Sequence, residues 1–117
     1  MNVIKKILRT KLLIMGLLVV MLTANAQHVS YITNHKAIAT ILAEKYGIPA
    51  SVILAVAVVE SSAGKGPTAK VLNNHFGIVG RNEYVNHRGH KSRYKQYPNV
   101  MASYMDFCEL ISRKRFY

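Results

Sequence analysis

The sequence predicts a mainly α-helical domain with a small β-hairpin lobe, an α+β fold class. Three observations carry this prediction. Apolar residues recur at helical spacing in several separate segments. One stretch between them, residues 78–97, has turn residues in place of helical spacing. The length of 117 residues suits one small domain rather than two.

Residues 1–26 show the three parts of a secretory signal peptide. The basic start is followed by an apolar stretch from Leu12 to Leu22 and by the small-x-small end Ala24-Asn25-Ala26. Eleven strongly apolar residues fall below the roughly 20 that a membrane-spanning helix needs, which disfavours an uncleaved anchor. We therefore expect cleavage after Ala26, no stable membrane span afterwards, and export to the periplasm, cell envelope or extracellular space.

The mature domain, residues 27–117, is basic and poor in cysteine. It holds 12 basic and five acidic side chains, a net charge of +7. Cys108 stands alone, so no internal disulfide is possible although export would allow one. His87 and His90 lack a third ligand for a metal site, and the sequence has no phosphate-binding glycine loop and no nucleophilic triad. We expect a monomer with no metal and no organic cofactor.

Two helices are expected in the first half of this domain. Residues 31–46 show helical spacing and end before Gly47, a favoured helix stop. Pro49 opens a second segment that runs toward Gly64. Five of its eight consecutive apolar residues are β-branched, so a buried strand also fits the pattern. Its length and its flanking residues favour a helix, and a helix that is apolar all round is expected to be buried at the domain centre.

The second half alternates helix and turn. Pro67 opens a short helix to about Leu72, and the turn residues of "NNHFGI" (73–78) follow. Residues 78–97 are rich in Arg, Lys, His and Tyr, and we predict a strand-turn-strand excursion there. A last helix is expected from about Asn99, because its basic end, residues 113–115, suits the negative end of the helix dipole.

The candidate catalytic residue is Glu60, directly after the apolar stretch. On a helix of residues 50–63, Ile53, Ala57 and Glu60 share one face. Hydrocarbon beneath the carboxylate and the negative end of the helix dipole both disfavour its charged form. Glycoside hydrolysis needs a protonated acid of this kind to donate to the departing sugar oxygen. The alternative is a solvated glutamate at a helix end, stabilised by Lys65 or a backbone amide.

A family resemblance supports the catalytic interpretation. The stretch "YGIPASVILAVAVVESSAGKG", followed by "TAKVLNNHFGIVG", "YKQY", "ASYMDF" and "RKRFY", resembles the bacterial glucosaminidase domain of glycoside hydrolase family 73, the mannosyl-glycoprotein endo-β-N-acetylglucosaminidase-like group. It covers about Ile32 to Tyr117. The resemblance implies a lysozyme-like fold and a secreted peptidoglycan hydrolase that cleaves glycan strands at N-acetylglucosamine, a β-1,4 glycosidic bond. It assigns the general acid to Glu60 and implies that the "NNxFGI" turn borders the cleft.

The sequence departs from the family pattern in two respects. Family members with a second catalytic carboxylate carry it in the β-lobe, where this chain offers only Glu83 in a motif that aligns poorly. A cleft water or the N-acetyl group of the substrate is the alternative. The family usually continues with further helices beyond the position of Tyr117, so we expect the family's last helices to be lacking. A natural short form, a fragment and an inactive remnant all stay open.

Aromatic and basic residues are the candidates for substrate binding. The basic side chains of the excursion interleave with tyrosines, a combination that suits an anionic polymer with sugar rings. Peptidoglycan glycan strands, whose stem peptides carry carboxylates, are the expected partner, and nucleic acid is not. The predicted contacts are Asn74, Phe76, Tyr84, Tyr94, Tyr97 and Tyr104. The rival functions are a non-catalytic cell-wall-binding module and, more weakly, an exported cationic protein that acts on membranes or nucleic acid.

Overall fold

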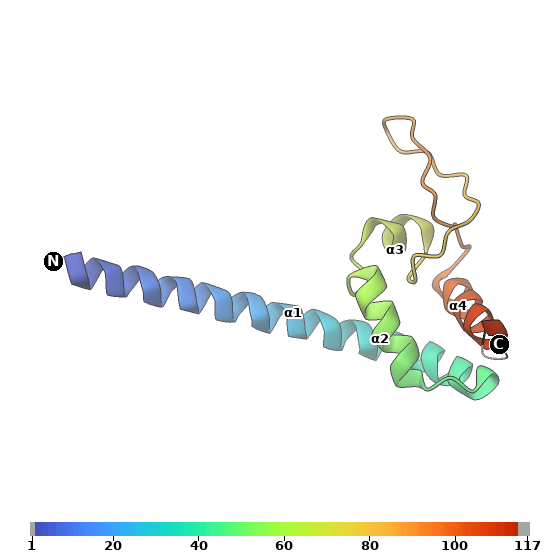
Figure 1. Cartoon of the computed structure of the whole chain (residues 1–117), viewed down its shortest axis with the longest axis horizontal. Coiled ribbons are helices and arrows are strands. Elements are labelled where there is room, and N and C mark those ends of the chain that lie inside the picture. Colours follow the sequence, from blue (N-terminus) through green and yellow to red (C-terminus); the bar gives the residue numbers. More distant parts are fainter. Residues whose placement is uncertain (1, 115–117) are drawn as a thin grey trace. The chain divides into compact units, whose positions relative to one another are not determined.

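The computed structural model describes residues 2–114, which divide into two compact units between Ser30 and Tyr31. Met1 and residues 115–117, the end of the "RKRFY" motif, lie outside the described residues. Four helices follow one another along the chain: α1 (Asn2–Tyr46), α2 (Ala50–Ser61), α3 (Pro67–Leu72) and α4 (Val100–Lys114) (Figure 1). The prediction of a mainly helical chain is therefore confirmed.

The first unit is a single stretch of α1. The sequence predicted a helix only from residue 31, but α1 is continuous from Asn2. The reason is local: from Leu17 to Tyr46 the chain has no glycine and no proline, so nothing stops helix propagation. By length and composition α1 is apolar enough to cross a membrane, a test that an N-terminal signal sequence also passes.

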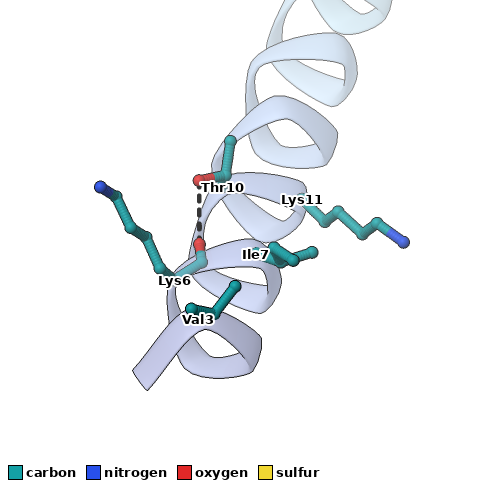
Figure 2. Close-up of a pocket in the computed structure, with 5 residues that line it drawn as sticks. All are labelled: Val3, Lys6, Ile7, Thr10 and Lys11. Atoms are coloured by element: carbon teal, nitrogen blue, oxygen red, sulfur yellow. Dashed lines mark hydrogen bonds between the residues drawn. The ribbon is translucent and has the colours of Figure 1, made fainter. Parts of the chain in front are cut away.

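A depression of about 560 Å³ lies beside the first turns of α1. Figure 2 shows the side chains that line it, Val3, Lys6, Ile7, Thr10 and Lys11, all from this one helix. The Thr10 hydroxyl donates a hydrogen bond to the backbone oxygen of Lys6 at 2.9 Å. Because one helix supplies the whole lining, the depression is an open groove along a solvent-exposed surface rather than an enclosed ligand site.

The core of the second unit joins the end of α1 to α2 and α4. The side chains that are no more than 2% exposed include Ala39, Leu42, Ile53, Ala57, Tyr104 and Cys108. Burial raises the pKa of the Cys108 thiol to about 11, so the thiol stays protonated and packs as a small apolar group. This agrees with the view of Cys108 as a structural rather than a reactive residue.

The helix α2 is buried along one face only. Ile53 and Ala57 have no exposed surface, whereas Val52 is 47% and Val59 75% exposed. The expectation that an all-apolar helix lies at the domain centre is wrong here, because the rest of this unit covers a single face of α2. Both of its ends agree with prediction to within a few residues: Gly47 and Pro49 precede it, and it ends just beyond Glu60.

The boundaries of α3 and α4 also agree with the sequence. α3 begins at Pro67 and ends at Leu72, as predicted. α4 begins one residue after Asn99, whose side-chain oxygen accepts a hydrogen bond from the backbone nitrogen of Ala102 at 2.8 Å. This is the standard arrangement by which a polar side chain satisfies an unpaired amide at a helix start.

The excursion, residues 78–97, folds back on itself without forming a regular strand among the described residues. Two isolated antiparallel bridges hold it, Val79 to Tyr94 and Val85 to Lys91. The Asn82 side chain also joins the two arms of the excursion, because its amide donates to the backbone oxygens of Ser92 and Tyr94. The predicted chain reversal is present, but the predicted β-hairpin lobe is not shown.

Candidate active site

Three segments of the chain come together at Gly77, and one of them carries Glu60. Glu60 lies in the last turn of α2. A Cβ atom placed on Gly77 would lie 3.5 Å from Glu60 Oε2 and 4.0 Å from Cε1 of the Tyr94 ring. The Glu60 carboxylate and the Tyr94 ring therefore both lie close to Gly77 of the "NNHFGI" turn. Since φ of Gly77 is +67°, glycine is suited to this position by its backbone conformation.

The Glu60 side chain is exposed, which corrects one expectation from the sequence. Desolvation by the hydrocarbon of α2 was predicted to favour the protonated acid. The apolar side chains near the end of α2, Val56 and Val59, leave the carboxylate open to solvent, and Val59 is itself 75% exposed.

The backbone just after Glu60 is strained. Ser62, Ala63 and Gly64 all adopt left-handed conformations, with φ of 51°, 53° and 77°. Ser62 and Ala63 carry a Cβ atom, and each such conformation costs about 1–3 kcal/mol. It persists only where the surrounding structure holds it in place. The Ser61 hydroxyl supplies part of that support, because it donates to Ala57 O at 2.5 Å and accepts from Gly64 N at 2.9 Å.

Asn74 builds the turn on which the carboxylate rests. Its side chain has no exposed surface. Its Nδ2 donates to the backbone oxygens of Ile78 and Lys95, both at 2.9 Å. Its Oδ1 accepts from the backbone nitrogens of Phe76, Gly77 and Ile78 at 3.3, 2.9 and 3.3 Å. Because every polar atom of this side chain is used inside the protein, we assign Asn74 to holding the turn rather than to contacting substrate.

A buried aromatic cluster lies behind the site. Its members, Tyr31, His35, His75 and Tyr104, come from α1, the turn and α4. The Tyr31 hydroxyl lies 2.6 Å from His75 Nδ1 and 2.6 Å from the Tyr104 hydroxyl. Burial, assisted by the charge of His35, lowers the pKa of His75 to about 4. Burial raises the pKa of both Tyr31 and Tyr104, so all three groups are uncharged at neutral pH.

The protein is expected to lose stability as the pH falls from about 6.5 to about 4. The unfolded chain takes up a proton at His75 near pH 6.5, whereas the folded protein does so only near pH 4. The unfolded state thus binds more protons in this window, and up to about 3 kcal/mol of stability, present above pH 6.5, is lost on acidification. Urea unfolding at pH 7 and pH 4.5 measures this loss. The loss should be clearly smaller in His75→Asn, which cannot titrate; an equal loss would contradict the prediction.

Hydrogen bonds from Tyr97 and Lys95 connect the end of the excursion to α4. Its hydroxyl donates to Asp106 Oδ2 at 2.6 Å, and Lys95 Nζ donates to the same oxygen at 2.9 Å. Partial burial disfavours the Asp106 charge, but these two donors outweigh it and lower the pKa of the carboxyl. Burial and the adjacent Asp106 raise the pKa of Tyr97. Tyr97 is 5% exposed, so its observed role is to anchor the arm that carries Tyr94.

The second candidate carboxylate, Glu83, has different neighbours from Glu60. It is exposed and forms an ion pair with Arg81 at 3.2 Å. With Gln96 and Tyr97 it borders an open depression of about 430 Å³. A solvated ion pair of this kind contributes little to stability. A catalytic role for Glu83 stays a prediction.

The remaining predicted substrate contacts divide by exposure. Phe76 and Tyr104 are buried and pack edge to face, with ring centroids 4.8 Å apart, so both rings belong to the core rather than to the surface open to a ligand. Tyr84 is 39% exposed and Tyr94 half-buried, so both rings are available to a ligand. Sequence reasoning missed Tyr31, which it counted only as part of an apolar helix face. Its hydroxyl was the available signal, since a buried tyrosine hydroxyl usually has a partner.

Together these observations define a helical domain with a glutamate at a helix end, next to a glycine turn that also lies close to an aromatic ring. The sequence model of the glucosaminidase family, described as mannosyl-glycoprotein endo-beta-N-acetylglucosaminidase, matches residues 36–117. The chain belongs to this family, and the resemblance noted from its motifs is confirmed. A comparison with curated proteins gives no significant match.

Two solved structures share the fold. One is the catalytic domain of the autolysin Auto from Listeria monocytogenes, with 23% identity, a TM-score of 0.59 and 71% of this chain covered. The other belongs to a type VI secretion system effector-immunity complex from Pseudomonas protegens, with 22% identity, a TM-score of 0.62 and 76% covered. The present chain spans 55% and 64% of their lengths. Both are consistent with the lysozyme-like helical fold expected for the family.

Proposed function

We propose that this chain is an exported peptidoglycan hydrolase that cleaves the β-1,4 glycosidic bond at N-acetylglucosamine, with Glu60 as general acid. Membership of the glucosaminidase family supports the class of reaction. The observation that carries the assignment of the acid is that the Glu60 carboxylate and the Tyr94 ring both lie close to Gly77. A carboxyl group beside an open backbone turn and an aromatic ring has the features of a sugar-binding catalytic site.

In this proposal the substrate completes the site. A glycan strand laid across Gly77 covers the exposed Glu60 carboxyl and removes water from it, which favours the protonated form. The acid then gives its proton to the leaving sugar oxygen as the bond from the anomeric carbon to that oxygen breaks. Water supplies the hydroxyl that ends on the anomeric carbon, and the other proton of that water goes to Glu83 or returns to Glu60. Without Glu83 as base, the N-acetyl oxygen of the substrate first bonds to the anomeric carbon as the leaving oxygen departs, and water then breaks that bond.

The aromatic and basic side chains of the excursion supply the binding energy. Tyr94 offers a ring beside the acid, and Arg93 lies over that ring at 5.3 Å from its centroid. Arg88 and Lys91 are exposed near the tip of the excursion, where no acidic residue follows Glu83 until Asp106. Positive charge in this position attracts the stem-peptide carboxylates of peptidoglycan.

Export by a cleaved signal peptide is the matching proposal for localisation. It is supported by the apolar N-terminal stretch of α1 and by the separation of residues 1–30 from the compact unit that carries Glu60. The substrate of the proposed reaction lies outside the cytoplasm, so export and activity are consistent with each other. Cleavage after Ala26 would leave the whole buried cluster around Tyr31 in the mature protein.

A second candidate is a non-catalytic module that binds the cell wall. The observation that favours it is the state of the two carboxylates: Glu60 is exposed, and Glu83 is occupied by Arg81. Such a module would use the same rings and basic side chains. It would release nothing from the glycan.

Product analysis tests the proposal. Purified peptidoglycan is incubated with the protein, the soluble fragments are reduced with borohydride, and their ends are identified by mass spectrometry. Fragments that end in reduced N-acetylglucosamine are expected. Fragments that end in reduced N-acetylmuramic acid would contradict the assigned bond. Protein that sediments with the peptidoglycan and releases no fragments would favour the binding module.

A further inference from the structure

Tyr31 contacts both the turn after Glu60 and the "NNHFGI" turn, and it lies outside the part of the chain that the family model matches. That model begins at residue 36, and Tyr31 precedes it. We propose that Tyr31 is a positioning residue that holds both segments flanking the Glu60 carboxylate: the strained turn after it and the "NNHFGI" turn against which it lies. This inference rests on the proposed function of Glu60.

The ring of Tyr31 supports the first segment. Its Cδ2 and Cε2 atoms both lie 3.1 Å from the point where a Cβ on Gly64 would stand. Gly64 is the third left-handed residue after α2, so the ring closes directly against the strained turn. The hydroxyl group of Tyr31 also interacts with Ser61, the residue next to Glu60. The ring and the hydroxyl of one side chain thus restrain the chain just after the acid.

The hydroxyl of Tyr31 supports the second segment. It lies 2.6 Å from His75 Nδ1, and His75 stands two residues before Gly77. The same oxygen lies 2.6 Å from the Tyr104 hydroxyl of α4. Both contacts are buried, since Tyr31 is 4% and Tyr104 0% exposed. Water does not replace them, so their loss leaves polar atoms without partners in the interior.

The expected effect of losing this hydroxyl is on the geometry of the site. The Tyr31 hydroxyl is hydrogen-bonded to His75, two residues before Gly77, and the Tyr31 ring packs against Gly64, four residues after Glu60. Loosening both segments lets the carboxyl drift from the position that the leaving oxygen requires. Misplacement by about 1 Å can cost up to about 100-fold in rate. Substrate affinity, supplied by the rings and cations of the excursion, should change little.

The test compares Tyr31→Phe with Tyr46→Phe. Tyr46 is also on α1, and its hydroxyl donates to Glu109 at 3.1 Å, far along the chain from Glu60. For Tyr31→Phe we expect the rate of release of reducing ends at saturating peptidoglycan to fall at least about tenfold. The half-saturating concentration should stay within about twofold of the wild type. Tyr46→Phe should change neither quantity beyond about twofold, so equal behaviour of the two variants would overturn the inference.

Hydrogen exchange gives a reading that does not depend on hydrolysis. The amides of Gly64 and Gly77 bond to Ser61 Oγ and Asn74 Oδ1. In Tyr31→Phe they should exchange at least about tenfold faster, relative to the core amides of α4, than in Tyr46→Phe. Uniformly faster exchange, as in general destabilisation, would contradict a positioning role.

A pair of substitutions at the partner residue covers the case in which Tyr31→Phe does not fold. His75→Asn keeps an acceptor near the Nδ1 position, whereas His75→Leu does not. The first should keep at least a third of wild-type activity, and the second should fall at least about tenfold below the wild type. Equal activities would overturn the inference. Glu60→Gln distinguishes a failure of the proposed function from a failure of the role of Tyr31. If Glu60→Gln stays active, the proposed function fails. An inactive Glu60→Gln together with an unimpaired Tyr31→Phe refutes only the role of Tyr31.

Discussion

Replacement of Glu60 by glutamine is expected to lower the release of reducing ends from peptidoglycan at least about 10³-fold. Glutamine has nearly the size of glutamate, so the contact with Gly77 is kept. An amide has no acidic proton to give to the leaving oxygen, and general acid catalysis contributes typically 10²–10⁴-fold. Sedimentation of the protein with peptidoglycan should be unchanged, because the binding groups of the excursion are untouched.

Glu109→Gln is the matched control for this substitution. Glu109 carries the same change of charge on α4, where its carboxylate accepts a hydrogen bond from Tyr46 and pairs with Arg113. Its activity should stay within about twofold of the wild type, since exposed ion pairs contribute at most about 1 kcal/mol. Glu60→Gln protein that still releases fragments at the control rate would refute the assignment of the acid. Loss of sedimentation in Glu60→Gln would instead give this carboxylate a role in binding.

Asn74→Ala is expected to destabilise the domain by about 3 kcal/mol or more. The substitution removes five hydrogen bonds at once and leaves the backbone groups of residues 76–78 partly unpaired in a buried region. A domain of this size is stable by about 4–13 kcal/mol, so the loss is a large fraction of the total. The midpoint of urea unfolding, followed by circular dichroism, measures it.

Asn86→Ala provides the comparison for Asn74→Ala. The Asn86 side chain also accepts two backbone hydrogen bonds, from Arg88 and His90, but these lie on the exposed part of the excursion. Water replaces such bonds, so the expected loss is below about 1 kcal/mol. If the two alanine variants unfold at the same urea concentration, Asn74 is not the support of the turn that its contacts indicate.

The helical part of the fold could be predicted from the sequence because its signals are local. Pro67 starts α3, Gly47 precedes α2, and Asn99 stands at the start of α4. Each residue acts on its own neighbours through φ preference or a missing or satisfied amide. The burial of α2 was not predictable in the same way. Which faces of an apolar helix are covered depends on the rest of the chain, and here Val59 is left exposed.

The site was predictable only in its sequence motifs. The glutamate and the "NNHFGI" turn carry a pattern, and the structure brings Glu60 and Gly77 together. The buried cluster carries none, because Tyr31 and Tyr104 are 73 residues apart and each fits an ordinary apolar helix position. The excursion was predicted as two strands, but among the described residues only isolated bridges form, and the Asn82 amide bonds to the backbone oxygens of Ser92 and Tyr94. Side-chain competition for the backbone is not visible in residue periodicity.

The three left-handed residues after α2 bear on attempts to engineer this protein for heat tolerance. Glycine at Ser62 or Ala63 would relieve an unfavourable backbone conformation, because glycine adopts positive φ without steric cost. At these positions glycine would also make the backbone of the turn next to Glu60 more flexible. Selection for a higher melting temperature alone would therefore favour variants that are more stable but in which the position of the Glu60 carboxylate is less well fixed.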